Sequence, residues 1–414
     1  MSVIRPFRAY RPARGYERLV AAPPYDVLSA EEARIAAEGN PYSFLRVDKA
    51  EICLDPSADP YGAAVYDTAA ANLSGLIGDG VLIKDGTPRL YIYRLEREGR
   101  VQTGLVGCVS VDEYRSGAIR RHELTRADKE SDRVRHVLAT GAHTGPIFLT
   151  YKKRAGISDI ISGYAAENAP EYDFTAADGV RHTVWVIGDA NAESSLVAAF
   201  AEAPALYIAD GHHRNAAAAA ARDALAAANP NHTGDEEYNY YLAVAFPDDE
   251  LYIMDYNRVV RALRGHDRAG FLREAGEKFF IEPSDTPVRP AERHTFGLYM
   301  NGSWRRMTAK PGTYDEADPI GSLDVSILQN NLLRPVLGIV DPRSDRGIDF
   351  IGGARGLSAL RERVDAGWAA AFSMYPTSVA ELETIADAGL VMPPKSTWFE
   401  PKLLSGLFIH KMTE

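Results

Sequence analysis

The sequence predicts a mixed α/β protein in which strands and helices alternate along the chain. Short apolar runs rich in β-branched and aromatic residues indicate buried strands. Capping motifs and an alanine-rich run indicate the helices between them. With 46% hydrophobic and 25% charged residues among 414, the composition is typical of a soluble globular protein. A chain of this length forms two or three domains, and we expect two lobes, residues 1–260 and 261–414.

The first 140 residues contain two predicted helices and two predicted strands. Ser29 and Glu32 have the S-x-x-E spacing of a helix capping box. Thr125 is expected to cap a second, highly charged helix. The strands are predicted over residues 89–94 and 103–111.

The middle of the chain is more regular. Five apolar runs predict strands at residues 146–151, 183–187, 206–209, 241–246 and 251–254. Helices are predicted at residues 192–203 and at the alanine-rich run 216–228, because alanine has the highest helix propensity. This alternation is typical of an α/β domain.

Local signals predict two elements of the second lobe. Asn301-Gly302 between apolar runs predicts a β-hairpin with a tight turn. Ser378 and Glu381 form another capping box, and Gly389 stands where a helix-terminating glycine is expected.

Charge and composition restrict the classes of partner. The formal net charge is −11, which disfavours a duplex-DNA partner because such proteins present basic faces to phosphates. The two cysteines cannot form a disulfide framework. No signal peptide and no apolar run of membrane-spanning length is visible, so we expect a cytoplasmic protein without a membrane partner. The oligomeric state is left open.

The segment Asp210-Gly211-His212-His213-Arg214 is the strongest candidate site. It lies between an apolar strand and a predicted helix, whose first amides are unpaired and at the positive end of the helix dipole. Phosphate is a natural ligand there. The histidines and arginine can donate hydrogen bonds to phosphate oxygens, and the aspartate can hold Mg²⁺ or orient a histidine.

Two other interpretations of this segment stay open. Asp210 is alternatively a simple helix N-cap beside a solvated turn, or the two histidines bind a transition metal such as zinc. A dinucleotide-binding fold is disfavoured because no G-x-G-x-x-G follows a strand, and no Walker A motif occurs. The absence of G-x-S-x-G removes the usual signature of a serine hydrolase.

Other polar segments are weaker candidates. His122 and Glu123 precede the charged helix. His122 is a candidate for donating a hydrogen bond to phosphate, and Glu123 is a candidate general base. Alternatively, both residues belong to a solvated helix face. Lys395 is a candidate for neutralising phosphate from the second lobe. The loop at residues 142–146 either lines a pocket or is a connecting turn.

Six segments in this order resemble a large bacterial and archaeal family catalogued as a domain of unknown function. They are residues 4–9 (IRPFRA), 21–27 (AAPPYDV), 40–45 (NPYSFL), 121–123 (RHE), 209–214 (ADGHHR) and 392–397 (MPPKST). The resemblance covers nearly the whole chain.

The ADGHHR segment also resembles the phosphate-binding motif of the ParB and sulfiredoxin-like superfamily. That superfamily includes kinases that phosphorylate free L-serine with ADP, and related enzymes that use pyrophosphate. The resemblance implies a ParB/sulfiredoxin-like core in which Asp210, His212, His213 and Arg214 hold the donor phosphates and Mg²⁺. It also implies a glutamate that activates the serine hydroxyl, for which Glu123 is the candidate. Sulfiredoxin's catalytic cysteine has no counterpart in the motif.

These observations predict a Mg²⁺-dependent phosphotransferase acting on a small hydroxyl amino acid, with a nucleotide or pyrophosphate as co-substrate. In this hypothesis Glu123, Asp210 and His212 are catalytic. Gly211, His213, Arg214, His122 and Lys395 contribute to phosphate binding. The alternatives are a phosphatase built from the same parts and a non-enzymatic ParB-like nucleotide- or DNA-binding protein or metabolite sensor.

Overall fold

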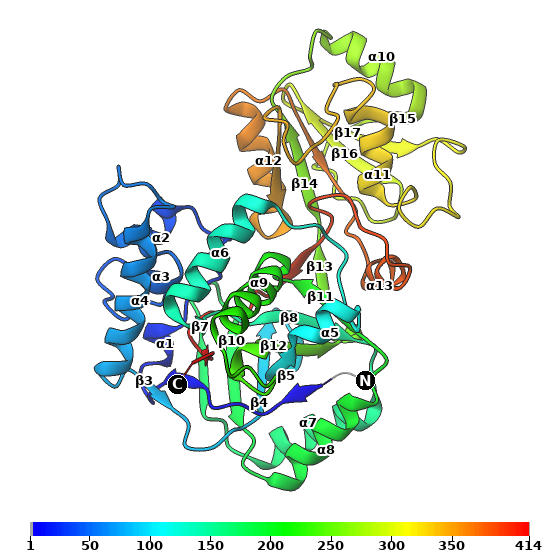
Figure 1. The fold of residues 1–414 in the computed structure, drawn as a ribbon. Helices are drawn as coiled ribbons and strands as arrows, with labels where there is room; N and C mark the ends of the chain where they lie inside the picture. Colours follow the sequence, from blue (N-terminus) through cyan, green and yellow to red (C-terminus); the bar gives the residue numbers. More distant parts are fainter. Residues whose placement is uncertain (1–2, 414) are drawn as a thin grey trace. The chain divides into compact units, whose positions relative to one another are not determined.

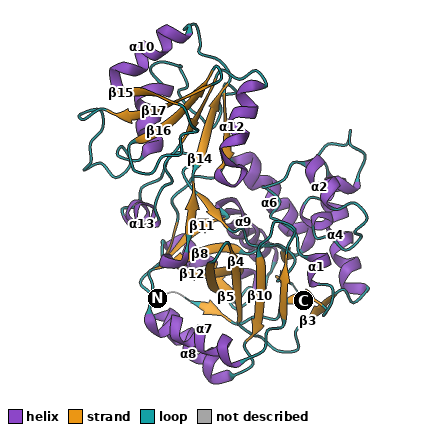
Figure 2. Ribbon diagram, turned by 180° about the vertical axis from the view of Figure 1, so that it is seen from behind, coloured by secondary structure: helices purple, strands orange, loops and turns teal. Residues whose placement is uncertain are grey.

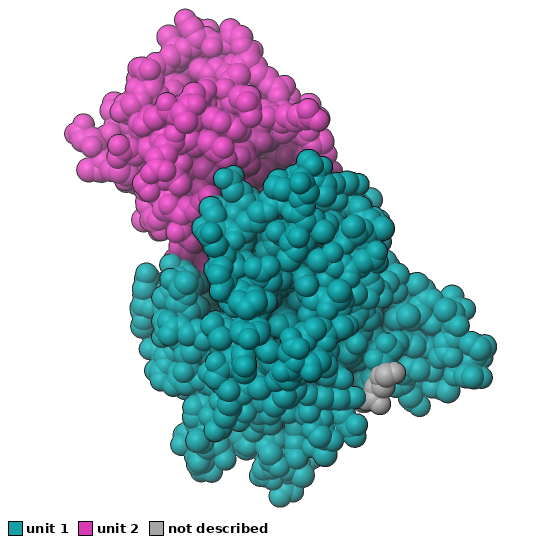
Figure 3. Space-filling model, turned by 90° about the vertical axis from the view of Figure 1, so that its left-hand side faces the viewer, with its two compact units in different colours: residues 1–121, 125–251, 401–414 teal, residues 122–124, 252–400 magenta. Residues whose placement is uncertain are grey.

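The computed structural model describes residues 3–413 and has the mixed α/β architecture that the sequence predicts (Figure 1). The chain forms two compact units, shown in different colours in Figure 3. Unit 1 comprises residues 1–121, 125–251 and 401–414, and unit 2 comprises residues 122–124 and 252–400. Each unit therefore contains segments that are far apart in the sequence.

Unit 1 is organised around a nine-stranded mixed sheet. Eight strands are hydrogen-bonded in the order β6-β11-β8-β12-β5-β4-β10-β9, and β1 pairs with β5. Their bounds are β1 (Ile4–Arg5), β4 (Tyr91–Arg97), β5 (Arg100–Ser110), β6 (Ile119–Arg120), β8 (Ile147–Tyr151), β9 (Tyr172–Thr175), β10 (Arg181–Val186), β11 (Leu206–Asp210) and β12 (Tyr240–Pro247).

The direction of two neighbouring strands brings two loops to one edge of this sheet. β11 is antiparallel to β8, with Asp210 opposite Phe148. The end of β11 therefore lies beside the beginning of β8. As a result, the segment after Asp210 and the segment before Ile147 emerge side by side from the same end of these two strands.

Helices and two small strand pairs complete unit 1 (Figure 2). The helices are α1 (Glu17–Val20), α2 (Ala30–Ala36), α3 (Leu45–Asp48), α4 (Ala63–Gly78), α5 (Val111–Ser116), α6 (Ala127–Thr140), α7 (Ala155–Glu167), α8 (Ala190–Ala201) and α9 (His212–Ala228). Short 3₁₀ turns occur at Ala50–Cys53, Glu237–Asn239 and Asp248–Glu250. The small pairs are β2 (Tyr10–Pro12) with β3 (Leu82–Lys84), and β7 (Ala142–His143) with β21 (His410–Lys411).

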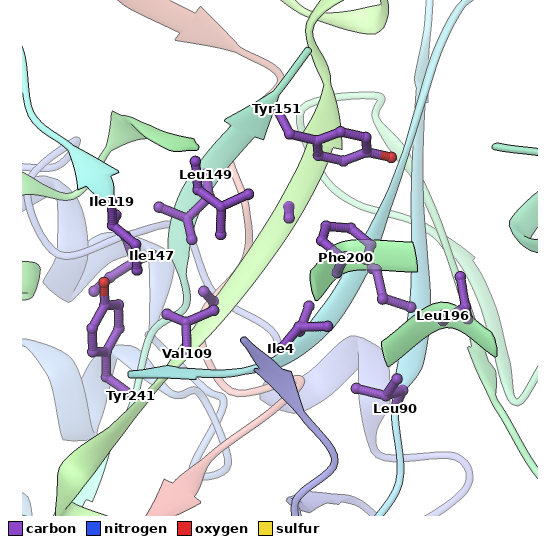
Figure 4. Close-up of a cluster of buried hydrophobic side chains, with 14 of the residues drawn as sticks. Ile4, Leu90, Val109, Ile119, Ile147, Leu149, Tyr151, Leu196, Phe200 and Tyr241 are labelled. Carbon is purple, nitrogen blue, oxygen red and sulfur yellow. The ribbon is translucent and has the colours of Figure 1, made fainter. Parts of the chain in front are cut away.

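The main core of unit 1 lies between the large sheet and three helices. Side chains of α7, α8 and α9 join apolar side chains of the strands in one buried cluster. Leu149 from β8 and Leu196 and Phe200 from α8 are among its members (Figure 4). These three side chains are completely buried, and burial of apolar surface is the main stabilising term in folding. The core fixes the strand ends from which the polar loops emerge.

Unit 2 contains a six-stranded sheet in the order β15-β17-β16-β19-β14-β18, and a separate pair of β13 with β20. Its strands are β13 (Tyr252–Met254), β14 (Tyr256–Val260), β15 (Phe279–Ser284), β16 (Thr295–Met300), β17 (Ser303–Ala309), β18 (Ile348–Gly352), β19 (Ala370–Ser373) and β20 (Trp398–Glu400). Its helices are α10 (Arg268–Lys278), α11 (Asp324–Leu328), a π-helix (Gln329–Leu333), a 3₁₀ turn (Gly353–Arg355), α12 (Gly356–Asp365) and α13 (Val379–Asp387).

Most of the local predictions are confirmed. Both capping boxes form, at Ser29 before α2 and at Ser378 before α13. β16 and β17 form the predicted hairpin. Asn301 and Gly302 both have positive φ, as a type I′ turn requires.

The predicted role of Thr125 is wrong. α6 begins at Ala127 after Arg126, without a side-chain cap. The Thr125 hydroxyl instead donates to Glu130 at 2.7 Å. Thr125 lies two residues before α6 begins, so its side chain contacts the Glu130 carboxylate within that helix instead of the first helical amides.

Two further findings concern the whole described chain. Between residues 3 and 413, no helix combines the length and apolar character needed to span a membrane. Cys53 and Cys108 are free thiols, in agreement with the absence of a predicted disulfide framework.

Candidate functional site

Gly211 forms the sharp connection between β11 and α9. Its φ of 97° lies in the left-handed region, which favours glycine because other residues meet a steric penalty there. A Cβ atom on this residue would lie 3.1 Å from Nε and Nη2 of Arg214. Gly211 is also the residue that precedes the helix, and it provides no side-chain cap. The alternative interpretation of Asp210 as the N-cap is therefore wrong.

Asp210 is held between two cations. Its Oδ2 lies 3.4 Å from Nζ of Lys402 and 3.6 Å from Nη2 of Arg214. Burial raises the pKa of Asp210, but the charges of Lys402, Arg214 and His212 outweigh this effect and lower the pKa to about 2. A β-bulge just before Asp210 shifts the register of the pairing with β8, and such bulges redirect side chains at strand ends. Asp210 is thus a directed, ionised carboxylate.

Arg214 extends from the first turn of α9 to the neighbouring strand end. Its side chain is 13% exposed, and Nη1 donates to the backbone carbonyl of Pro146. Nε is buried and has no hydrogen-bond partner within residues 3–413. Arg214, Lys402 and Asp210 form a cluster with two positive charges and one negative charge. A chain of net charge −11 therefore has a local excess of positive charge here.

The two histidines of the segment have different surroundings. His212 is buried at the start of α9. His213 accepts a hydrogen bond at Nε2 from the backbone amide of Arg126, at 3.1 Å. In a neutral ring this contact leaves the proton on Nδ1. His213 therefore links the start of α9 to the segment that leads into α6.

Asn215 lies one residue beyond the predicted segment. Its side chain is completely buried, and neither amide atom has a hydrogen-bond partner in the described part of the chain. Each buried polar group without a partner costs about 1–3 kcal/mol. Such groups are rare in folded proteins, and Asn215 adds a second unpartnered polar side chain to the first turn of α9.

A small cavity of about 30 Å³ adjoins Arg214 within unit 1. Its polar lining side chains include Tyr25, Asp48, Arg133, His143, Thr144 and Arg214. The backbone of Ala22 pairs with that of Ser405, another lining residue. The cavity therefore brings residues from the AAPPYDV segment, from the loop at 142–146 and from ADGHHR together.

Asp48 organises the polar wall of this cavity. Its Oδ1 accepts a hydrogen bond from the Thr144 hydroxyl at 2.6 Å, and its backbone carbonyl accepts one from Arg133 at 3.4 Å. Arg133 also pairs with Asp132 at 2.8 Å and lies over the ring of Tyr25 at 4.1 Å. Because these groups are buried and mutually paired, the wall is a fixed array.

The remaining predicted site residues belong to unit 2. The backbone carbonyl of His122 accepts a hydrogen bond from Met392 at 2.8 Å, and its Nε2 lies 3.3 Å from the Thr397 hydroxyl. The RHE and MPPKST segments are thus brought together in this unit. The carbonyl of Lys395 accepts from Arg258 at 3.0 Å. Glu123 is partly exposed in the same unit.

Sequence reasoning missed several members of the site in unit 1. Lys402, which contacts Asp210, is not among the residues that the sequence singles out. Asp48, Arg133 and Asn215 carried no recognisable motif. His143 belonged to a loop for which lining a pocket was one of two interpretations. Their common signal, burial of a polar side chain, becomes visible only in the folded chain.

Substitution of Gly211 tests whether the Arg214 guanidinium requires a glycine. Gly211→Ala is expected to reduce the free energy of unfolding by more than Gly234→Ala. Both glycines have nearly the same φ, 97° and 98°, so each substitution costs about 1–2 kcal/mol of backbone strain. A Cβ at Gly234 has nothing within 4 Å. Denaturant titration of both variants measures the difference, and equal losses would contradict the expected clash.

Removal of the Lys402 charge tests the electrostatics of Asp210. Lys402→Met is expected to raise the pKa of Asp210 above about 2, because an attractive cation is lost. A ¹³C NMR titration of the carboxyl group measures this pKa, and Lys411→Met serves as the control. An unchanged pKa would contradict the assigned contact.

The same shift has a consequence for stability. The pKa of Asp210 is lower in the folded chain than its ordinary value of 3.8. Ionised Asp210 therefore stabilises the fold above about pH 4, and this contribution is lost as the pH falls through about 2. In Lys402→Met the loss should begin at higher pH.

Comparisons with solved structures give distant likenesses. This chain is similar to a free serine kinase mutant in complex with AMP, at 12% identity and a TM-score of 0.37, covering 71% of this chain and 87% of that one. It is similar to SbnI with a C-terminal truncation from Staphylococcus aureus, at 12% identity and a TM-score of 0.39, covering 72% and 85%. It is also similar to a conserved hypothetical protein from Pyrococcus furiosus, at 12% identity and a TM-score of 0.37. That match covers 73% of this chain and 94% of the other one.

These likenesses are too weak to assign a fold family or an activity, so the ParB/sulfiredoxin-like core stays a prediction. Comparison with curated proteins gives no match. The family comparison is decisive, because a single family model matches residues 4–326, most of the chain. The chain belongs to the family of proteins of unknown function termed DUF1015.

Proposed function

We propose that this protein is a Mg²⁺-dependent phosphotransferase that moves a phosphoryl group from pyrophosphate or an adenine nucleotide to the hydroxyl of a small amino acid, with free L-serine as the first choice. The observation that carries the proposal is the turn at Gly211. It places the amino end of a 17-residue helix beside Lys402, Arg214 and His212.

Helix geometry and local charge favour a phosphate ligand at this turn. The amides at the start of α9 point out of the helix, at the positive end of its dipole. The guanidinium of Arg214 and the ammonium of Lys402 add two full positive charges. Phosphoryl transfer depends mainly on positioning and on neutralising charge on the transferred group. The turn supplies both from a rigid strand-to-helix connection.

Asp210 suits the role of the metal ligand. Its carboxylate is ionised, and the ion pairs formed by the described residues reach Oδ2. Mg²⁺ prefers oxygen ligands and is commonly held by one or two carboxylates together with substrate phosphates. Asp210 would hold the ion through Oδ1, and the bound ion would neutralise charge on the donor phosphates.

The other predicted residues keep their proposed roles. His212 and His213 donate hydrogen bonds to phosphate oxygens, His213 through Nδ1. Glu123 is the sequence-based candidate for the base that receives the serine hydroxyl proton. His122 and Lys395, which belong to unit 2, are the remaining sequence-based candidates for phosphate binding.

A product assay tests the proposed reaction directly. The purified full chain is incubated with Mg²⁺, L-serine and, separately, pyrophosphate, ADP or ATP, and O-phosphoserine is detected by mass spectrometry. Product with at least one donor is the expected result. Product with no donor would sink the serine proposal, and release of phosphate to water without O-phosphoserine would favour the phosphatase alternative.

Replacement of Asp210 tests the assignment of the site. Asp210→Ala is expected to reduce kcat by at least about 100-fold, since removal of one charge-stabilising group in an active site commonly costs this much. Asp159→Ala, an exposed position in α7, should leave kcat unchanged. Circular dichroism verifies that both variants are folded. Activity of Asp210→Ala close to that of the unchanged protein would show that the site lies elsewhere.

A further inference from the structure

A buried chain of hydrogen bonds ends at the cavity beside Arg214. His143 on β7 and His410 on β21 are cross-strand partners, and their Nδ1 atoms lie 3.1 Å apart. Nε2 of His410 donates to Glu237 at 2.9 Å, and Glu237 pairs with Arg5 at 2.8 Å. His143 is 6% exposed and His410 is 2% exposed. All four residues belong to unit 1.

The order of donors and acceptors along these hydrogen bonds fixes the tautomer of His143. The Glu237 carboxylate only accepts, so Nε2 of His410 carries a proton. Arg5 also pairs with Glu237, and in the neutral ring of His410 the proton on Nε2 leaves Nδ1 unprotonated. Nδ1 of His143 must then donate to it. Burial holds the pKa of His143 well below its ordinary value, so the ring is neutral and Nε2 of His143 keeps a lone pair.

That lone pair belongs to a side chain that lines the cavity. His143 shares the cavity wall with Arg214 and Asp48. Nε2 is buried and has no hydrogen-bond partner among the residues that the structure describes. A base oriented by a second group, which is in turn oriented by a carboxylate, has the arrangement of a catalytic triad. Here the oriented base is next to a guanidinium of the proposed phosphate site.

We propose that Nε2 of His143 receives the proton of the acceptor's hydroxyl group. The inference rests on the proposed phosphotransferase function and assigns its proton acceptor within unit 1. The cavity has about 30 Å³ of free space, and about 10–15 Å³ is enough to hold one water molecule. It therefore admits a group as small as the hydroxymethyl group of a small amino acid.

The O–H bond of the acceptor breaks, and its proton passes to Nε2 of His143. The acceptor oxygen forms a bond to the terminal phosphorus of the donor. The bond from that phosphorus to the bridging oxygen breaks, and its electron pair leaves with pyrophosphate's second phosphate or with the shortened nucleotide. The Nδ1–H group of the ring donates to His410, whose Nε2–H donates to Glu237, and the proton on Nε2 of His143 then passes to the leaving phosphate or to solvent.

The tautomer is measurable without any turnover. Full-length protein labelled with ¹⁵N-histidine is studied by long-range ¹H–¹⁵N correlation, and His143→Asn assigns the signal. The expected spectrum shows a neutral His143 with its proton on Nδ1 near neutral pH. Addition of L-serine should shift the Nε2 resonance. A proton on Nε2, or an imidazolium, would overturn the inference whatever the protein catalyses.

Kinetics provide the second readout. His143→Asn keeps an amide that can donate to His410 and removes the group at the Nε2 position. We expect kcat to fall about 10²–10⁴-fold, the usual contribution of a general base, with KM for L-serine changed only a few-fold. His182 is a matched control, because it is buried, its Nε2 also has no partner within residues 3–413, and it does not line this cavity. His182→Asn should leave kcat unchanged.

The outcomes separate this inference from the proposed function. If the unchanged protein makes O-phosphoserine and His143→Asn retains most of its kcat while Glu123→Gln does not, the base is Glu123 and the inference is wrong. If the unchanged protein makes no product with any donor, the proposed function fails. In that case a serine-induced shift of Nε2 would still support His143 as the hydroxyl acceptor, and no shift would overturn it.

Discussion

The ion pairs of Asp210 connect three segments that are distant in the chain. Lys402 comes from the C-terminal segment, Asp210 ends β11, and Arg214 lies in the first turn of α9. Without the two cations, a carboxylate at this strand end would have a raised pKa, because burial disfavours its charge. The same cations are the groups that attract an anionic ligand. One set of contacts thus supports both the local fold and the proposed chemistry.

Arg214 transmits this arrangement to the neighbouring cavity. Its donation to the Pro146 carbonyl fixes the loop before β8 against the loop after β11. That loop also contains Thr144, whose hydroxyl donates to Asp48, and it begins next to His143 on β7. Glycine at position 211 leaves room for the guanidinium to lie across the turn, because a Cβ atom there would come within 3.1 Å of it. The position of the cavity wall therefore depends on the geometry of the strand-to-helix turn.

The sequence predicted the features that depend on neighbouring residues. The capping boxes at Ser29 and Ser378 and the turn at Asn301-Gly302 are set by interactions over a few positions. The contact of Lys402 with Asp210 spans 192 positions, and no local pattern encodes it. The assignment of segments to the two units is likewise not encoded locally. Residues 122–124 belong to unit 2 although the residues on both sides belong to unit 1, and residues 401–414 belong to unit 1 although they follow unit 2 in the sequence. A boundary drawn from composition is linear and cannot represent it.

The polar atoms that lack partners also distinguish a site from a stabilising core. Nε of Arg214, Nε2 of His143 and the amide of Asn215 are all buried without a partner in the described residues. Each is expected to cost about 1–3 kcal/mol, against a total stability of about 5–15 kcal/mol for a typical domain. Apolar side chains at these positions would avoid the cost. Local violations of packing rules concentrate where function requires them, and two of these side chains line one cavity beside the motif that the sequence singles out. A polar ligand that satisfies them would explain why such a costly arrangement is built beside the strand-to-helix turn.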